Sequence, residues 1–290
     1  MQMFKPFILR NAIAIATAWL SFLIPAWGGT NSAGHAYPAD MALAVKIGNE
    51  LYQTLDRGCR KKIAPQAISM EQMAAPEIAP IMSNDASTSP CRVLISTGFV
   101  DLINHIAHAR AIDRIQPGYF QQYMSILGRE SAGENPPDPP NLADARYWSA
   151  AVMNDQAGYF NQMVGIAISI NLSHHYLGHY QKYAGQMPAG KRAPINDFIA
   201  PAEWEASVKA ATLNSLDCAL GTEGAEALFE AIDQMPRRPA WTAYIVPTNV
   251  NIKKLNKRLA TYEAAYFHGG LKLDKSIAAL TETPGGLAAN

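Results

Sequence analysis

The sequence predicts a mainly α-helical fold, with a short strand or two, in a single domain. Two observations lead to this class. Apolar residues recur at helical spacing in most segments that lie between the prolines, and the long segment 145–183 holds no proline and is apolar on almost every side at its centre. The chain is 49% hydrophobic and shows no internal repeat, so it can form one sizeable core without dividing into domains.

Residues 1–36 have the order of a secretory signal peptide. Two basic residues, Lys5 and Arg10, precede an apolar run that is followed by small residues. A membrane-spanning helix needs roughly 20 apolar residues, and this run is too short. We therefore expect cleavage between Trp27 and Tyr37 and an exported protein, periplasmic or secreted, without a stable membrane span.

The chain expected after cleavage, residues 37–290, is close to neutral. The full sequence holds 24 Lys and Arg against 24 Asp and Glu, and removing Lys5 and Arg10 leaves 22 basic residues. Nucleic-acid binding requires a strongly basic surface, so this class of partner is excluded. We expect instead a protein or a peptide of the cell envelope, as substrate or as partner.

The three cysteines, Cys59, Cys91 and Cys218, leave two alternatives open. Export to an oxidising compartment permits a disulfide, and a bridge from Cys59 to Cys91 would staple the segment between them. Alternatively, all three thiols are unpaired. Neither alternative predicts a catalytic cysteine.

The first half of the exported chain alternates predicted helices with one strand and two loops. Leu43, Ile47, Leu51 and Leu55 follow one another at four-residue intervals, as on one face of a helix. Residues 63–90 are rich in Ala, Pro, Ser and Met and show little periodicity, which indicates a surface loop. The predicted elements are helices over 39–57, 99–114 and 119–127, a strand and turn over 91–98, and surface loops over 63–90 and 131–142.

The second half is predicted to be helical around one buried helix. Residues 163–172 are apolar on almost every side, which is typical of a central helix, and they are too few to span a membrane. Prolines and glycines then separate shorter segments. The predicted elements are helices over 145–183, 202–219, 225–235 and 252–267, a strand over 241–247, and a weakly ordered tail from about residue 272.

Three of the seven histidines lie within residues 174–179, at the end of the predicted central helix. Residues four apart on a helix project the same way, so His175 and His179 can present two imidazoles to one metal ion. His174 lies about 100° around the helix from His175, and we expect it to play a structural role.

Two short motifs lie on consecutive predicted helices: His175-Tyr176-Leu177-Gly178-His179 and Glu203-Trp204-Glu205-Ala206-Ser207. Together they resemble the signature of the gluzincin metallopeptidases, His-Glu-x-x-His followed by Glu-x-x-Ala-Asp, as in the HtpX-like and CAAX prenyl protease family. The strand 93–96 and the residues 98–102 after it are similar to the strand and first core helix of that family. The resemblance extends over 91–235.

The resemblance implies a single helical zincin-like domain with one bound zinc ion. Its ligands would be His175, His179 and Glu203, with Glu205 as the fallback third ligand. Three protein ligands and a water molecule in the fourth position are what hydrolytic zinc sites use.

The chain departs from the signature at two positions. The glutamate that serves the family as general base is Tyr176 here, and Ser207 replaces the final aspartate. A tyrosine with an ordinary pKa of about 10 is a poor base at neutral pH. Hydrolysis would therefore need a base from elsewhere, and the candidates are Glu205, Asp155 and Asp217.

Three functional hypotheses follow from the resemblance: a peptidase with a base from another position, a zinc site without hydrolysis, or a decayed peptidase fold that serves binding. The alternative from a different class is a non-enzymatic helical module of the cell envelope that binds another protein. In that module the histidines would make hydrogen bonds inside the core. His105 and His108, three apart on a predicted helix, could add a metal ligand, although we expect a solvated or capping role for them.

Overall fold

The computed structural model describes residues 37, 39, 41–82, 91–129, 136–188 and 193–269. The predicted signal peptide and the tail expected from about residue 272 lie outside these residues, as do parts of both predicted loops. Within them the chain is mainly helical with one small sheet, as the sequence predicts.

The elements occur in the following order along the chain. The helices are α1 (Met41–Thr54), α2 (Arg57–Arg60), α3 (Thr97–Asp113), α4 (Tyr119–Leu127), α5 (Ala150–Tyr176), α6 (His179–Tyr183), α7 (Pro201–Asp217), α8 (Glu223–Gln234) and α9 (Ile252–Gly269). The strands are β1 (Ile68–Glu71), β2 (Ile78–Met82) and β3 (Cys91–Ser96).

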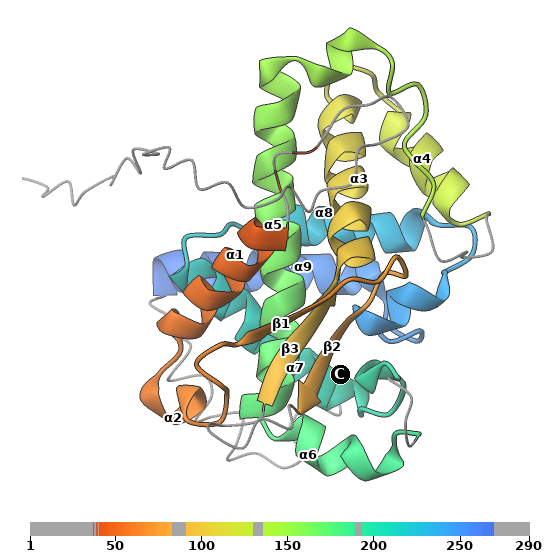
Figure 1. Ribbon diagram of the computed structural model, residues 1–290. Helices are drawn as coiled ribbons and strands as arrows, with labels where there is room; N and C mark the ends of the chain where they lie inside the picture. The colour runs from red at the N-terminus through yellow and green to blue at the C-terminus, as the bar shows by residue number, and fades with distance from the viewer. Residues whose placement is uncertain are drawn as a thin grey trace, which may run out of the picture.

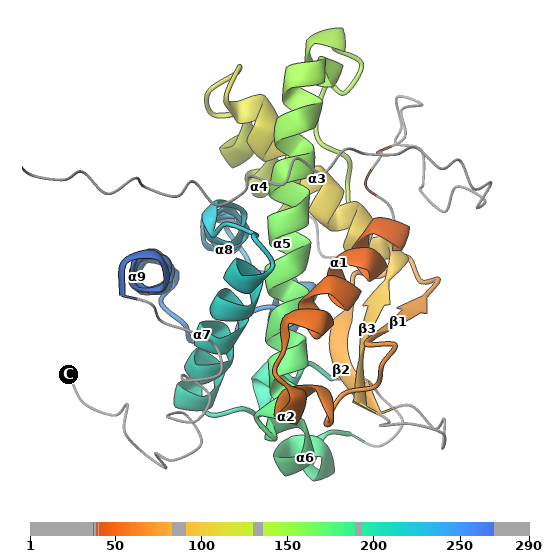
Figure 2. The same cartoon turned by 90° about the vertical axis from the view of Figure 1, so that its left-hand side faces the viewer.

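Helix α5 runs through the centre of the fold (Figure 1). Every residue from 163 to 176 is buried, which confirms the predicted central helix. Helices α7 and α8 pack against one side of α5, with α9 beyond them, and α1 and the sheet pack against the other side (Figure 2). Helix α3 also packs along α5. The C-terminal end of α5 therefore lies where helices and strands from both halves of the chain meet.

The sheet has the strand order β1-β3-β2, with β1 parallel and β2 antiparallel to β3. Strand β3 confirms the predicted strand. The surface loop predicted over 63–90 is wrong in part, because it contains both β1 and β2. Within the described part of the chain, these strands pair only with β3. They are four and five residues long, and β2 contains Pro80. Short edge strands that tolerate a proline leave little periodicity in a sequence.

Two further predictions of secondary structure are wrong. The predicted helix over 145–183 breaks at Gly178, whose φ of 84° lies in the left-handed region, so that α5 ends at Tyr176 and α6 starts separately. The strand predicted over 241–247 is a 3₁₀ helix, Ala240–Tyr244, with hydrogen bonds between residues three apart. A short apolar run does not distinguish a strand from a buried helical turn.

Cys59, Cys91 and Cys218 are free thiols, the first two buried. Among the residues that the structure describes, no helix is long and apolar enough to span a lipid bilayer.

Candidate histidine site

The histidine cluster lies at the C-terminal end of α5, next to α2 and α6 (Figure 2). The Lys62 Nζ donates a hydrogen bond to the Tyr176 carbonyl oxygen at 2.7 Å and so caps one of the last carbonyls of α5. The left-handed Gly178 then turns the chain into α6. This turn, and not a continuous helix, determines where His179 lies.

His174 and His179 face each other across this turn. Their Nδ1 atoms are 3.4 Å apart, and both rings are buried. The Ser207 Oγ from α7 lies 3.2 Å from the His174 Nδ1 and 3.0 Å from the His179 Nδ1. One hydroxyl can accept a hydrogen bond from one imidazole and donate to the other, so Ser207 can link two neutral rings. The three atoms form a compact triangle inside the protein.

Burial keeps these imidazoles neutral. It lowers the pKa of His174 well below its usual range, and the neighbouring His179 and His175 lower it further. Burial also lowers the pKa of His179 to about 4, with Glu203 acting against the shift and Lys182 adding to it. A neutral imidazole with a free nitrogen lone pair is the form that binds metal ions.

Glu203 lies close enough to His179 for the charges to interact, but its carboxylate is paired elsewhere. The Lys182 Nζ lies 2.7 Å from Oε1, and the Tyr183 hydroxyl donates a hydrogen bond to Oε2 at 2.5 Å. Burial acts to raise the pKa of Glu203, and the two hydrogen bonds outweigh it, so the pKa is lowered. The carboxylate is therefore ionised and held in place by α6.

His175 does not join this triangle. Its Nε2 lies 2.7 Å from the Arg92 carbonyl oxygen on β3, and its ring packs against Tyr180. The structure thus brings together His174 and His179, whereas the sequence predicts a pair of His175 and His179 and a structural role for His174. The physical reason is the helix break at Gly178, which removes the four-residue stacking on which that pairing depended.

The candidate bases lie apart from the two facing imidazoles. Glu205 forms an ion pair with Arg258 of α9, on the side of α7 opposite to Ser207. Asp155 pairs with Arg114 at 2.8 Å and is about 28 Å along α5 from His174. Asp217 accepts a hydrogen bond from the Tyr266 hydroxyl at 2.8 Å at the far end of α7.

Tyr176 is also unsuited to act as a base. Its hydroxyl is buried and has no hydrogen-bond partner among the described residues, and burial, with smaller contributions from Cys59 and Asp56, raises its pKa well above the usual range. A phenol in this environment stays protonated at neutral pH. No step of hydrolysis can be assigned to it.

The predicted zinc ligands therefore do not fit as a set of three. His175 is bound to a backbone carbonyl, and Glu203 is bound to Lys182 and Tyr183. In the part of the chain that the structure describes, no three His, Cys, Asp or Glu side chains are arranged to hold a metal ion. The remaining candidate is the pair of His174 and His179.

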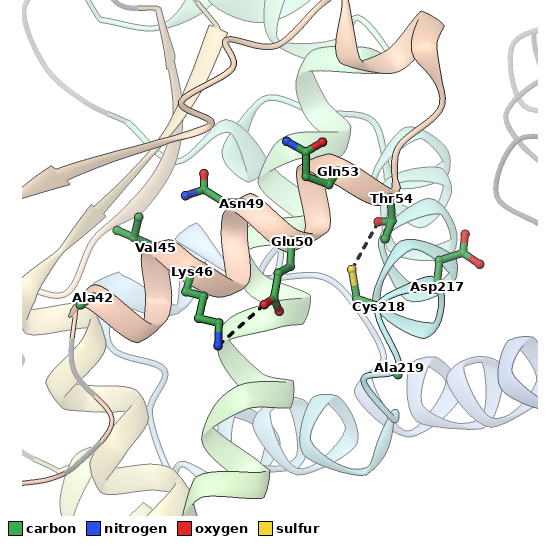
Figure 3. A pocket seen from close by; sticks show the side chains of 10 residues that line it. All are labelled: Ala42, Val45, Lys46, Asn49, Glu50, Gln53, Thr54, Asp217, Cys218 and Ala219. Carbon is green, nitrogen blue, oxygen red and sulfur yellow. Dashed lines mark hydrogen bonds and ion pairs between the residues drawn. The ribbon is translucent and has the colours of Figure 1, made fainter. Parts of the chain in front are cut away.

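A separate shallow groove of about 730 Å³ lies between α1 and the C-terminal end of α7 (Figure 3). None of the three clustered histidines lines it. The Thr54 Oγ1 lies 3.3 Å from the Cys218 Sγ at its edge, and burial is the main reason why the pKa of this thiol is raised. A protonated thiol is a weak nucleophile, so the groove has no evident reactive group.

Comparison of the chain with known proteins identifies no relative. No family model matches the chain, and no curated protein and no solved structure matches it.

Sequence reasoning missed two members of the site, His174 and Ser207. The signal that could have found His174 is Gly178, because a glycine at the end of a helical segment commonly ends the helix. In the sequence, Ser207 is notable only because it replaces the final aspartate of the motif Glu-x-x-Ala-Asp. Its contacts with two imidazoles depend on how α7 packs against α5, which no local pattern indicates.

Proposed function

We propose that this chain is an exported, zincin-like helical protein that binds zinc through His174 and His179 and does not hydrolyse peptides. The observation that carries the proposal is the 3.4 Å separation of the two Nδ1 atoms. Two nitrogens bound tetrahedrally to zinc at about 2.0–2.1 Å lie about 3.4 Å apart. The separation is thus one that a shared metal ion would favour.

The surroundings of the pair support a bound ligand. Both imidazoles are neutral, as ligands must be. Glu203 is the nearby carboxylate that could contribute a further ligand, after giving up its contacts with Lys182 and Tyr183.

The absence of hydrolysis in this proposal follows from the positions of the candidate bases. Tyr176 is buried and protonated, and Glu205, Asp155 and Asp217 each pair with another side chain. Loss of a general base slows hydrolysis by about two to four orders of magnitude. Zinc would therefore act here as a structural or stored ion and not as a catalytic one.

Metal analysis of the exported chain, purified without a histidine tag, tests the proposal. We expect about one zinc ion per chain, and loss of the ion in both His174→Ala and His179→Ala. The matched control is His175→Ala, which changes the adjacent residue and should keep the metal. Native protein that binds no zinc by calorimetry at micromolar concentration would overturn the proposal. So would equal loss of zinc from all three variants.

The hydrogen bond between His175 and the Arg92 carbonyl favours a second candidate function, a non-enzymatic module of the cell envelope that binds another protein. In that module all three histidines stabilise the core. Its distinct expectation is that the metal-free chain is folded and gains no stability when zinc is added.

A further inference from the structure

The Ser207 hydroxyl completes a set of three donor atoms with the two facing imidazoles. The His174 Nδ1 and the His179 Nδ1 are 3.4 Å apart, and the Ser207 Oγ lies 3.2 and 3.0 Å from them. Nitrogen and oxygen ligands lie about 2.0–2.2 Å from a tetrahedral zinc ion, and so about 3.3–3.6 Å from one another. Three atoms with the observed separations can all lie about 2.0–2.1 Å from one point. They therefore match one face of a zinc coordination tetrahedron.

The packing of α7 against α5 determines where Ser207 lies. Ser207 is completely buried. Asn214 is seven residues further along α7, about two turns of the helix, and so lies on the same face. Its Nδ2 donates a hydrogen bond to the Ser169 Oγ on α5 at 3.0 Å, five residues before His174. The two helices that share this contact therefore also carry the Ser207 hydroxyl and one of the imidazoles, and helices hold ligands more precisely than loops do.

Ser207 is better placed than Glu203 to act as a third ligand. The two residues are four apart on α7 and so share one side of the helix. The Glu203 carboxylate must first leave Lys182 and Tyr183, whereas the Ser207 Oγ already lies beside both imidazoles. A hydroxyl oxygen has two lone pairs, so it can bind a metal ion and keep its hydrogen. The ion would replace the hydrogen bonds between this hydroxyl and the imidazoles.

The histidines of α3 do not supply the third ligand. His105 and His108 are 7% and 0% exposed, which contradicts the solvated or capping role expected for them. The His105 Nε2 lies 3.4 Å from the Asp138 Oδ1. The His108 Nδ1 lies 3.1 Å from the Tyr37 hydroxyl, and its Nε2 lies 2.8 Å from the Tyr147 carbonyl oxygen. Both rings thus pair with residues outside the triangle of donor atoms.

We propose that the Ser207 hydroxyl oxygen is the third ligand of the metal ion, beside the Nδ1 atoms of His174 and His179. This inference rests on the proposed function, because it names a further ligand of the same zinc site. An uncharged hydroxyl is a weaker ligand for zinc than the cysteine thiolate that many zinc sites use. A sulfur in place of this oxygen should therefore strengthen metal binding. A serine that only bridges the imidazoles by hydrogen bonds predicts the reverse, because a thiol is a weak hydrogen-bonding group.

Zinc affinity and cobalt(II) absorption, measured on the whole exported chain with a non-chelating reductant, test this inference. We expect Ser207→Cys to bind zinc at least about tenfold more tightly than the wild type, and Ser207→Ala at least about tenfold less tightly. With cobalt(II) as the probe, Ser207→Cys should gain the intense near-ultraviolet band of a cobalt–thiolate bond. The matched control is Ser215→Cys, at another buried serine about 12 Å along α7, and it should show neither effect.

The outcomes separate this inference from the proposed function. If the wild type binds zinc and loses it in His174→Ala and His179→Ala, the proposed function stands. Unchanged zinc affinity in a folded Ser207→Ala would then overturn only the assignment of Ser207. So would the absence of the cobalt–thiolate band in Ser207→Cys, or an equal band in Ser215→Cys, and these results decide if Ser207→Ala does not fold. Wild-type protein that binds no zinc would overturn both.

Discussion

Gly178 decides which histidines meet. Its φ of 84° is readily adopted by glycine and is unfavourable for residues with a Cβ atom. The chain leaves α5 at this residue and re-enters a helix in a new direction, so that His179 returns to His174 and not to His175. A single backbone conformation thus selects one pair of imidazoles out of three.

Gly178→Ala should therefore lower the free energy of unfolding by about 1–2 kcal/mol, because alanine must adopt a left-handed conformation. Chemical denaturation in urea measures the change. The matched control is Gly158→Ala in α5, where an added Cβ meets no atom within 4 Å. Since alanine favours a helix over glycine, this control should be neutral or stabilise by up to about 1 kcal/mol. Equal effects of the two substitutions would contradict the role of Gly178.

At the scale of the elements, a chain of polar contacts joins α5, α7 and α1. The Asn214 Nδ2 on α7 donates a hydrogen bond to the Ser169 Oγ on α5 at 3.0 Å. The Thr54 hydroxyl at the end of α1 donates to the Asn214 Oδ1 at 2.8 Å. Asn214 and Ser169 are completely buried, so these bonds link three helices inside the core.

Asn214→Ala should destabilise the protein by about 2–3 kcal/mol, because it removes the partner of the buried Ser169 hydroxyl and opens a small cavity. Combined with Ser169→Ala in a double-mutant cycle, it should show a coupling energy of about 0.5–1.5 kcal/mol. Thr212→Val is the matched control on α7, since the Thr212 hydroxyl bonds only to Val208 of its own helix. A coupling energy near zero would show that the contact does not join the helices.

At the scale of the whole molecule, buried histidines should make the metal-free protein sensitive to acid. Burial lowers the pKa of His175 and His179 from 6.5 to about 4, and that of His174 also falls. Unfolding exposes these rings, which then take up protons. Their stabilising contribution is complete above pH 6.5 and is lost as the pH falls from 6.5 through about 4.

Asp101 acts in the opposite sense, because its pKa is raised from 3.8 to about 6. Its contribution to stability is complete below pH 3.8 and is lost as the pH rises through 6. The change in stability is opposite in sign to that caused by one buried histidine and about equal in size. His105, with a lowered pKa of about 4, adds to the effect of the three clustered histidines. The net expectation is a loss of several kcal/mol between pH 6.5 and 4, since each pKa unit corresponds to about 1.4 kcal/mol.

Urea unfolding in the presence of a chelator at several pH values between 7.5 and 4.5 measures this dependence. His175→Gln keeps a donor for the Arg92 carbonyl and removes one titrating group, so it should reduce the slope with pH. His268→Ala, at an exposed position, should leave the slope unchanged. Stability that does not depend on pH in this interval would contradict the burial of neutral imidazoles.

Most of the fold could be predicted from local patterns, and the histidine site could be predicted only in part. The helices with clear apolar periodicity and the strand β3 appear where the sequence places them. The edge strands β1 and β2 were missed because they are only four and five residues long and one of them contains a proline. The segment 174–179 was correctly expected at the end of the central helix, but the pairing of its histidines was wrong.

The sequence by itself determined the class of the fold, the central helix and the position along the chain where three histidines gather. These features depend on local composition and periodicity, which a sequence displays directly. Only the tertiary structure decided that His174 faces His179, that Ser207 links them and that Asp138 reaches His105. Such contacts depend on the direction of a chain after a turn and on the packing of distant elements, which no local pattern records.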